Sequence, residues 1–260
     1  MRPLTKEVRY LALRAMQTVT PGLLLSIMRR RSCEPEMALL PVLSDPSRTA
    51  VDIGANDGVY ADLLRARGGP VVAFEPNPLL VTYLRRVFGA RVRVEGVALS
   101  DQTGEAEIRI PRYHYGHATM EDENALEKLT ASDEIRTVSV PTKRLDDYQL
   151  SDVGFIKVDV EGFEGAVLRG GLSTIRRDQP NILVEIEERH KPGAIAATTA
   201  LLREVGYEGF FYQHGELRPL STFDRVSLQS VDHIGGKHSQ YINNFIFSVT
   251  GRLRAGMSAA

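Results

Sequence analysis

The sequence contains a single cysteine and no tryptophan. One thiol, Cys33, cannot form a disulfide within the chain, so no disulfide framework holds this fold together. Proteins without structural disulfides suit a reducing compartment, and we therefore expect this protein to be cytoplasmic.

An excess of either charge is also missing. The chain has 32 Lys and Arg residues against 33 Asp and Glu residues, which gives a formal net charge of −1. Nucleic-acid binding depends on basic side chains that neutralise phosphates, so the charge balance gives no reason to expect a nucleic-acid partner.

Long apolar runs are lacking as well. The mild apolar run at 23–28 follows Pro21 and Gly22 and is far shorter than the roughly 20 residues that cross a bilayer. No small-residue cleavage site follows it, which argues against a secretory signal.

Residues 1–40 are nevertheless distinct, because basic residues flank this apolar run on both sides. We expect an N-terminal helical extension that packs on a domain formed by residues 41–260. The alternative is an amphipathic helix that rests on an anionic membrane surface, peripheral to the inner face of the membrane. The absence of Trp and Phe anchors in this segment favours packing.

From residue 49 onward, short apolar runs alternate with helical stretches, which is typical of an α/β sheet with helices on both faces. The predicted strands are 49–54, 71–74, 92–99, 155–159, 181–186, 207–212 and 244–249, and the predicted helices include 60–66, 78–88 and 194–205. Alternating residues at 105–110 and the apolar run at 137–140 predict an inserted hairpin and lid over about 105–141, with a long polar loop at 111–134.

A glycine-containing turn follows the first of these strands, with Asp52, Gly54, Asn56 and Gly58 in order. Glycine permits a sharp turn and a close approach of a ligand, and ligands of open α/β sheets bind beyond the carboxyl ends of strands. A dinucleotide fingerprint would need a second glycine where Asn56 stands, so the turn is a poor pyrophosphate site. Asp52 and Asn56 instead offer acceptors for an ammonium group and a donor for a carboxylate.

Glu75 ends the second predicted strand, 23 positions after Asp52. A carboxylate there can accept hydrogen bonds from both ribose hydroxyls of an adenosine-type cofactor. The alternative is a carboxylate that caps a solvent-exposed turn. Asn77 and Pro78 follow as an N-cap and a first helical residue.

An ordered set of motifs resembles the FkbM-type methyltransferases. The motifs lie at 51–60, 74–78, 98–101, 116–120, 140–147, 156–164, 180–186 and 244–247. The resemblance covers about residues 49–249, and residues before about 48 fall outside it.

This resemblance implies a Rossmann-like class I methyltransferase fold, with a seven-stranded, mostly parallel sheet. It also implies methyl transfer from S-adenosylmethionine to a hydroxyl of a sugar, glycolipid or polyketide-type natural product, so that the partner is a small-molecule or glycan acceptor. By the same resemblance, Asp52, Gly54 and Asn56 hold the methionine end, Glu75 holds the ribose, and Ala98 and Ser100 border the adenine. The other candidate cofactor contacts are Gly58, Tyr60, Asn77 and Asp159.

A hydroxyl acceptor needs a base near the transferred methyl group. Asp159 is the first candidate because it follows a central strand, and Glu161 and Glu185 lie close to it in the predicted sheet. His117, in the inserted segment, is another candidate. The three carboxylates could instead bind Mg²⁺ or Ca²⁺, but they complete no obvious ligand set and a metal is not favoured. The other alternative is structural, with Glu161 or Glu164 capping the helix that follows.

Two other functions stay open at this point. One is a nicotinamide-dependent oxidoreductase, which the departure from the dinucleotide fingerprint disfavours. The other is a non-catalytic protein that keeps the cofactor fold as a scaffold, which the retained carboxylates disfavour. Nothing in the sequence points to a particular oligomeric state.

Overall fold

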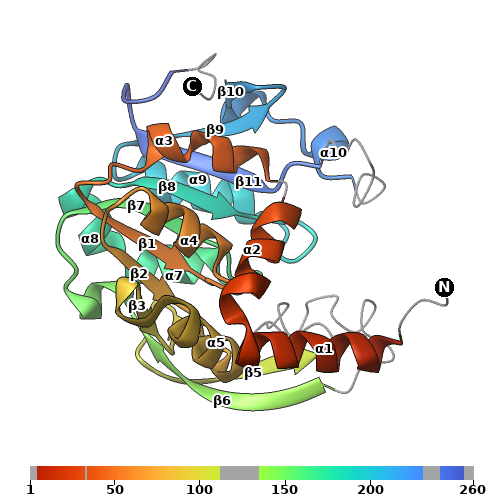
Figure 1. Ribbon diagram of the computed structural model, residues 1–260. Helices are drawn as coiled ribbons and strands as arrows, with labels where there is room; N and C mark the ends of the chain where they lie inside the picture. Colours follow the sequence, from red (N-terminus) through yellow and green to blue (C-terminus); the bar gives the residue numbers. More distant parts are fainter. Residues whose placement is uncertain (1–4, 33, 112–134, 231–240, 255–260) are drawn as a thin grey trace.

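The centre of the molecule is an eight-stranded sheet in the order β10-β9-β11-β8-β7-β1-β2-β3 (Figure 1). The computed structural model describes residues 5–32, 34–111, 135–230 and 241–254. The strands of this sheet are β1 (Thr49–Ile53), β2 (Val71–Phe74), β3 (Arg93–Glu95), β7 (Val153–Val158), β8 (Asn181–Glu185), β9 (Tyr207–Gln213), β10 (Glu216–Pro219) and β11 (Asn244–Val249). Five neighbouring strands from β3 to β8 are parallel, whereas β11 is antiparallel to both β8 and β9.

The strand order reverses beside β1. The chain runs from β1 outward to β2 and β3, and then returns to β7 on the other side of β1, where Ile53 pairs with Val158. In sheets of this kind the crevice beyond the carboxyl ends of the strands at such a switch point is where ligands bind. The fold therefore directs attention to the loops after β1, β2, β7 and β8.

Helices lie on both faces of the sheet (Figure 1), and alternate residues of a strand face opposite layers. Ala50 of β1 packs with α4, α5 and the N-terminal helices, whereas Val51 packs with α7, α8 and α9 on the other face. These helices are α4 (Val59–Ala66), α5 (Pro78–Phe88), α7 (Glu164–Gly170), α8 (Leu172–Asp178) and α9 (Ala194–Arg203), and the shorter helical turns are η2 (Gly89–Arg91), η3 (Leu145–Tyr148), η4 (Leu220–Thr222) and α10 (Arg225–Leu228). This is the α/β architecture with helices on both faces that the sequence predicts.

The N-terminal residues contribute to the first of these two layers. They form α1 (Lys6–Val19), α2 (Pro21–Arg31), η1 (Pro35–Leu39) and α3 (Leu40–Leu43), and their buried leucines are Leu24, Leu25, Leu39, Leu40 and Leu43. α2 contacts both α4 and α5, and its Arg29 forms a 3.0 Å ion pair with Asp62 of α4. No helix within the described ranges is both long enough and apolar enough to cross a membrane. The division at residue 40 stays a prediction.

A second, three-stranded sheet contains the predicted hairpin. β5 (Gly104–Pro111) pairs antiparallel with β6 (Ile135–Lys143), and β4 (Ala98–Leu99) pairs parallel with β6. The predicted pairing of 105–110 with 137–140 is confirmed, and the paired strands extend further than predicted. Residues 112–134, which include His117 and most of the predicted lid, lie outside the described residues.

The prediction of one continuous strand over 92–99 is wrong. β3 belongs to the main sheet and β4 to the second sheet, with Gly96 and Val97 between them. The physical reason lies in the packing. Val94, Val97 and Ala98 belong to three different apolar clusters, and the side chains of one straight strand reach only the two faces of its sheet.

The main sheet also has one strand more than the expected seven, because β10 folds back on β9. Gln213 pairs with Glu216 across a two-residue loop in which His214 and Gly215 have φ values of 53° and 86°. Positive φ at both loop residues matches the tight hairpin turns that suit the twist of paired strands. The other seven strands correspond to the predicted sheet.

Candidate active site

Gly54 brings the loop after β1 directly against the loop after β7. Its φ is 78°, and a Cβ built there would lie 1.8 Å from the carbonyl oxygen of Asp159. Two backbones can approach this closely only where a side chain is absent. The sequence-predicted turn and the first candidate base are therefore neighbours.

The rest of the turn is equally constrained. Asn56 has a φ of 48°, and Gly58, with a φ of 82°, is the N-cap residue of α4. A Cβ on Gly58 would lie 2.7 Å from Cδ2 of Leu84, so α5 restricts this position as well. The turn therefore keeps a fixed shape at the start of α4, where backbone N–H groups and the helix dipole favour negative charge.

Glu75 joins the turn to the next loop. Its carboxylate accepts hydrogen bonds from the backbone N–H of Asn56 at 2.9 Å and from that of Asn77 at 2.8 Å. The side chain is buried, and this burial raises its pKa to about 7, against the two hydrogen bonds that lower it. Asn77 in turn caps α5 by accepting from the N–H of Leu79, as the sequence predicts.

Asp52 is the most enclosed carboxylate near the turn. Its side chain is 1% exposed, and it accepts a hydrogen bond from the backbone of Ala61 in α4. Within the described residues, its Oδ2 atom has no hydrogen-bond partner. Burial raises the pKa of Asp52 to about 7, and nearby Lys157 opposes this rise. A buried oxygen without a donor is an acceptor available to a ligand.

Lys157 is buried near the end of β7, where it forms a charge cluster with the half-buried Asp159 and Glu185. The Lys157 ammonium lies 3.5 Å from Oδ2 of Asp159 and 3.8 Å from Oε2 of Glu185. Because Lys157 is 1% exposed, it needs such partners to stay charged. Burial opposes the charge on Lys157, but the carboxylates prevail and raise its pKa.

The side chains of Asp159 and Glu185 are also hydrogen-bonded to each other. Burial raises the pKa of both groups, while Lys157 opposes the rise, and the negative charge of Asp159 raises that of Glu185 further. Two neighbouring carboxyl groups in such a place share a proton between them. A proton-sharing pair can accept and release a proton, as a general base must.

Glu161 is also close to this cluster, on a residue with a φ of 49°. Its Oε2 lies 3.1 Å from Nδ1 of His190, which follows β8. The predicted helix cap at Glu164 is not formed: Glu164 is the first residue of α7 and accepts from the backbone N–H of Gly162 at 2.8 Å, which holds the turn before the helix. His190 was not among the predicted site residues.

Tyr60 faces the cluster from α4. Its ring centroid lies 5.0 Å from the Lys157 ammonium, and its hydroxyl donates to Oε2 of Glu34 at 2.6 Å. Asn244 of β11 donates to the same Glu34 oxygen at 3.5 Å, and the neighbouring Asn243 donates to Glu185 at 2.7 Å. Tyr60 was a predicted site residue, whereas Glu34, Asn243 and Asn244 were not.

Ala98 and Ser100 lie on the side of the second sheet. Ala98 packs with Ile108, Ile110 and Val140, and the backbone N–H of Ser100 donates to Lys143 of β6. The structure thus brings together Asp52, Gly54, Asn56, Gly58, Tyr60, Glu75, Asn77, Asp159, Glu161 and Glu185 around the switch point. His117 lies outside the described residues. Within the described ranges, no three His, Cys, Asp or Glu residues gather as a metal site.

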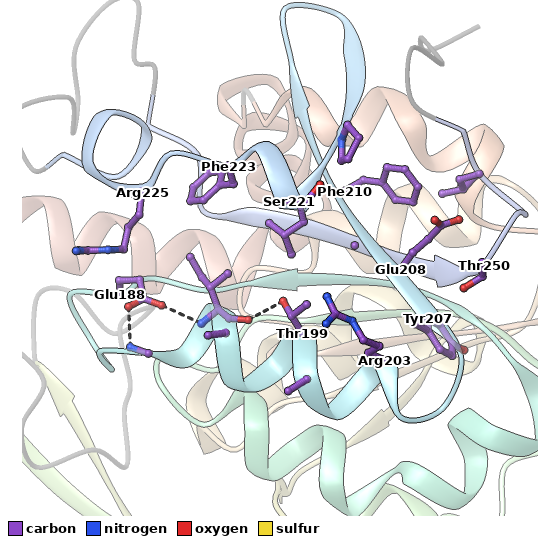
Figure 2. Close-up of a pocket in the computed structure, with 18 of the residues that line it drawn as sticks. Glu188, Thr199, Arg203, Tyr207, Glu208, Phe210, Ser221, Phe223, Arg225 and Thr250 are labelled. Carbon is purple, nitrogen blue, oxygen red and sulfur yellow. Dashed lines mark hydrogen bonds between the residues drawn. The ribbon is translucent and has the colours of Figure 1, made fainter.

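A cavity of about 1000 Å³ lies elsewhere, between α9 and the β9–β10 hairpin (Figure 2). Apolar residues such as Phe210, Leu220 and Phe223 line it, and none of the predicted site residues does. At one end Glu188 accepts from the N–H groups of Gly193 and Ile195 and thereby caps α9. We place the candidate active site at the switch point rather than in this cavity, because the titratable groups are gathered there.

Comparisons with known structures concern the fold of the chain. The chain resembles the crystal structure of the methyltransferase FkbM from Methylobacillus flagellatus, with 17% identity and a TM-score of 0.52, over 92% of this chain and 57% of that one. It also resembles an O-methyltransferase from Bacillus cereus in complex with SAH, with 13% identity and a TM-score of 0.47, over 96% and 92% of the two chains. No curated protein matches the chain.

The model of the methyltransferase FkbM domain matches residues 52–209, which is more than half of the chain. The match begins at Asp52 and includes Glu75, Asp159 and Glu185, whereas Glu34 lies before it. The chain therefore belongs to the FkbM family of S-adenosylmethionine-dependent methyltransferases.

Proposed function

We propose that this protein transfers a methyl group from S-adenosylmethionine to a hydroxyl of a sugar, glycolipid or polyketide-type natural product. The observation that carries this proposal is the half-buried Asp159–Glu185 pair, held by Lys157 and in contact with the glycine turn through Gly54. A base beside a cofactor turn is what a hydroxyl acceptor requires.

The residues of the turn fit the cationic, amino-acid end of this cofactor. We assign that end to Asp52, Gly54, Asn56, Gly58 and Tyr60. The buried Oδ2 of Asp52 offers an acceptor to an ammonium group, and Gly54 leaves space where a side chain would be. Glu75 and Asn77 are assigned to the ribose, and Ala98 and Ser100 to the adenine.

The chemistry follows from the carboxyl pair. The bound cofactor supplies an electrophilic methyl group on a positively charged sulfur. Asp159 accepts the hydroxyl proton of the acceptor, and Glu185 shares that proton through the hydrogen bond between the two side chains. Lys157 holds Asp159 in place through an ion pair, and its positive charge balances the negative charge of the Asp159–Glu185 pair. Glu161 and His117 are assigned to the acceptor side of the site.

Binding measurements test this proposal first. We expect calorimetry to detect S-adenosylmethionine binding to the wild-type protein, and we expect weaker binding by Asp52→Asn and Glu75→Gln. Glu216→Gln, an exposed carboxylate of β10, is the matched control and should bind as the wild type does. Failure of the wild type to bind the cofactor contradicts the proposal.

A nicotinamide-dependent oxidoreductase is the competing enzyme. The site holds Asp52, Asp57, Asp159 and Glu185 against one lysine, and this excess of carboxyl groups disfavours a pyrophosphate. Titration with NADH should therefore give no tight binding. Cofactor binding without formation of S-adenosylhomocysteine across a broad panel of hydroxyl acceptors would favour a non-catalytic scaffold instead.

The same proposal places the protein in the cytoplasm, with α1 resting on the inner membrane surface when the acceptor is a glycolipid. Val8, Leu11 and Val19 of this helix are exposed, at 45%, 58% and 76%. Co-sedimentation with anionic vesicles tests this contact, and Leu11→Asp should reduce it if α1 is the contact surface.

A further inference from the structure

One carboxylate of the candidate site comes from outside the family domain. Glu34 precedes η1, eighteen positions before the matched residues begin, yet it contacts Tyr60 of α4 and Asn244 of β11. The family comparison and the sequence motifs both begin after this residue. The contacts of Glu34 therefore indicate its role.

The N-terminal segment holds Glu34 from both sides. Before it, Leu24 and Leu25 of α2 are buried in the core, and Arg29 is paired with Asp62. After it, Leu43 of α3 is buried, and the backbone oxygen of this residue accepts from the Asn181 side chain at 2.8 Å. The position of Glu34 is therefore fixed by packing.

The contacts of Glu34 lead directly to the carboxyl pair. Tyr60 donates to Glu34 at 2.6 Å, and the Tyr60 ring faces the Lys157 ammonium, which is paired with Asp159. Burial and the Glu34 carboxylate raise the pKa of Tyr60, so its hydroxyl stays protonated and keeps donating. Glu34 thereby fixes the ring that covers one side of Lys157.

An independent observation indicates that this corner receives a ligand. Asn244 is 2% exposed and donates to Glu34 through its Nδ2, while its Oδ1 has no partner within the described residues. The buried Oδ2 of Asp52, whose charge acts on Lys157, is in the same condition. The surroundings of Lys157 and Glu34 thus include two buried acceptors without donors.

We propose that the N-terminal segment completes the methyl-transfer site, with Glu34 as a positioning residue that holds Tyr60 and adds negative charge where a cationic cofactor group binds. This rests on the function proposed above. Glu34 acts on Asp57, Lys157, Asp159 and Glu185 through its charge, so its field reaches both the glycine turn and the ends of β7 and β8. Charge attraction of this kind distinguishes a sulfonium from a neutral thioether.

The test compares S-adenosylmethionine with S-adenosylhomocysteine, because only the first carries a positive sulfur. We expect Glu34→Gln to weaken binding of S-adenosylmethionine about tenfold, as for loss of a charged partner, and to weaken S-adenosylhomocysteine binding much less. Glu34→Asp should restore part of this preference. Glu7→Gln, on the exposed face of α1, is the control and should behave as the wild type.

The pH of this test matters because several charged and titratable groups surround Glu34. They are Glu36 on η1, Asp52 on β1, Asp57 on the glycine turn, Tyr60 on α4, Lys157 and Asp159 on β7 and its loop, and Glu185 on β8. Measurements at pH 8 and at pH 6 show whether their protonation changes the preference. We expect a larger preference for S-adenosylmethionine at pH 8, where more of these carboxyl groups are ionised.

A second measurement keeps this proposal separate from the proposed function. In the ligand-free protein, a double-mutant cycle of Glu34→Gln and Tyr60→Phe in urea unfolding should give a coupling between the two changes. Equal loss of affinity for both cofactor forms, or no loss at all, would overturn the role of Glu34 while leaving methyl transfer intact. If the wild-type protein binds neither form of the cofactor but the double-mutant cycle shows coupling between Glu34 and Tyr60, the result contradicts the proposed function alone.

Discussion

The Cα of Gly54 faces the carbonyl oxygen of Asp159 so closely that a Cβ atom would lie 1.8 Å from it. This contact ties the loop after β1 to the loop after β7. Both loops carry residues assigned to the methyl donor and to the base, so the geometry of the site depends on a position with no side chain.

Gly54→Ala should therefore destabilise the protein and abolish cofactor binding. We expect a loss of about 2–4 kcal/mol in the free energy of unfolding, because the new methyl group must displace backbone atoms. Gly68→Ala is the matched control: this glycine has a φ of 100°, but a Cβ there meets nothing within 4 Å. The control should lose only about 1–2 kcal/mol, the cost of a left-handed residue. Equal losses in urea unfolding would show that the Asp159 contact is unimportant.

Asp159→Asn should remove the base while leaving the cofactor bound. We expect the turnover rate to fall about 10²- to 10⁴-fold, the usual contribution of general-base catalysis. Cofactor affinity, measured by calorimetry, should change far less than the rate. A variant that retains wild-type turnover would exclude Asp159 as the base and direct attention to Glu161 or His117.

Stability without ligand should fall as the pH rises from about 4 to 7. Burial raises the pKa of Asp52 from 3.8 to about 7 and that of Glu75 from 4.5 to about 7. The folded state then binds more protons than the unfolded state in this range, so stability is fully present below the unfolded pKa and is lost as the pH rises through the folded pKa. Asp147, whose pKa its partners lower to about 2, titrates below this window.

Thermal unfolding of the ligand-free protein at pH 5.5 and pH 8 measures this effect. We expect a higher Tm at pH 5.5, and a smaller difference for Glu75→Gln, because that variant cannot ionise at this position. Glu107→Gln, an exposed position on β5, should keep the full difference. A Tm that rises with pH over this range runs against the proposed protonation of the buried carboxyl groups.

Removal of divalent cations should leave methyl transfer unchanged. The Lys157 ammonium already lies between Asp159 and Glu185, at 3.5 and 3.8 Å, where a metal ion would otherwise balance their charge. We expect the same formation of S-adenosylhomocysteine before and after dialysis against EDTA. Loss of activity that Mg²⁺ restores would establish the metal-dependent alternative.

The elements that position the site follow from local sequence signals. The strand before Gly54, the Asn77 cap and the carboxylate at Glu75 each have a pattern within a few residues, and the structure contains all of them. The boundary between β3 and β4 has no such pattern, because Gly96 is the single turn-forming residue between Val92 and Leu99. The boundary becomes apparent only in the folded structure, where Val94, Val97 and Ala98 pack in three separate apolar clusters.

The contacts that the sequence did not predict are those between distant positions. Glu34 and Tyr60 are 26 residues apart, and Glu34 and Asn244 are 210 apart. An isolated carboxylate between two helical segments has no spacing that indicates a partner. The β10 hairpin is different, since the positive φ of Gly215 follows from a local turn signal that could have been recognised.

The last strand, β11, occupies a place between β8 and β9 rather than at an edge. β11 pairs with both β8 and β9, so the β9–β10 hairpin joins the rest of the main sheet only when β11 is in place. Asn243 and Asn244 at its start hold Glu185 and Glu34. We therefore expect these contacts to form late in folding. In pulse-labelling hydrogen exchange, the amides of β11 and β9 should become protected together, after those of β1 and β2.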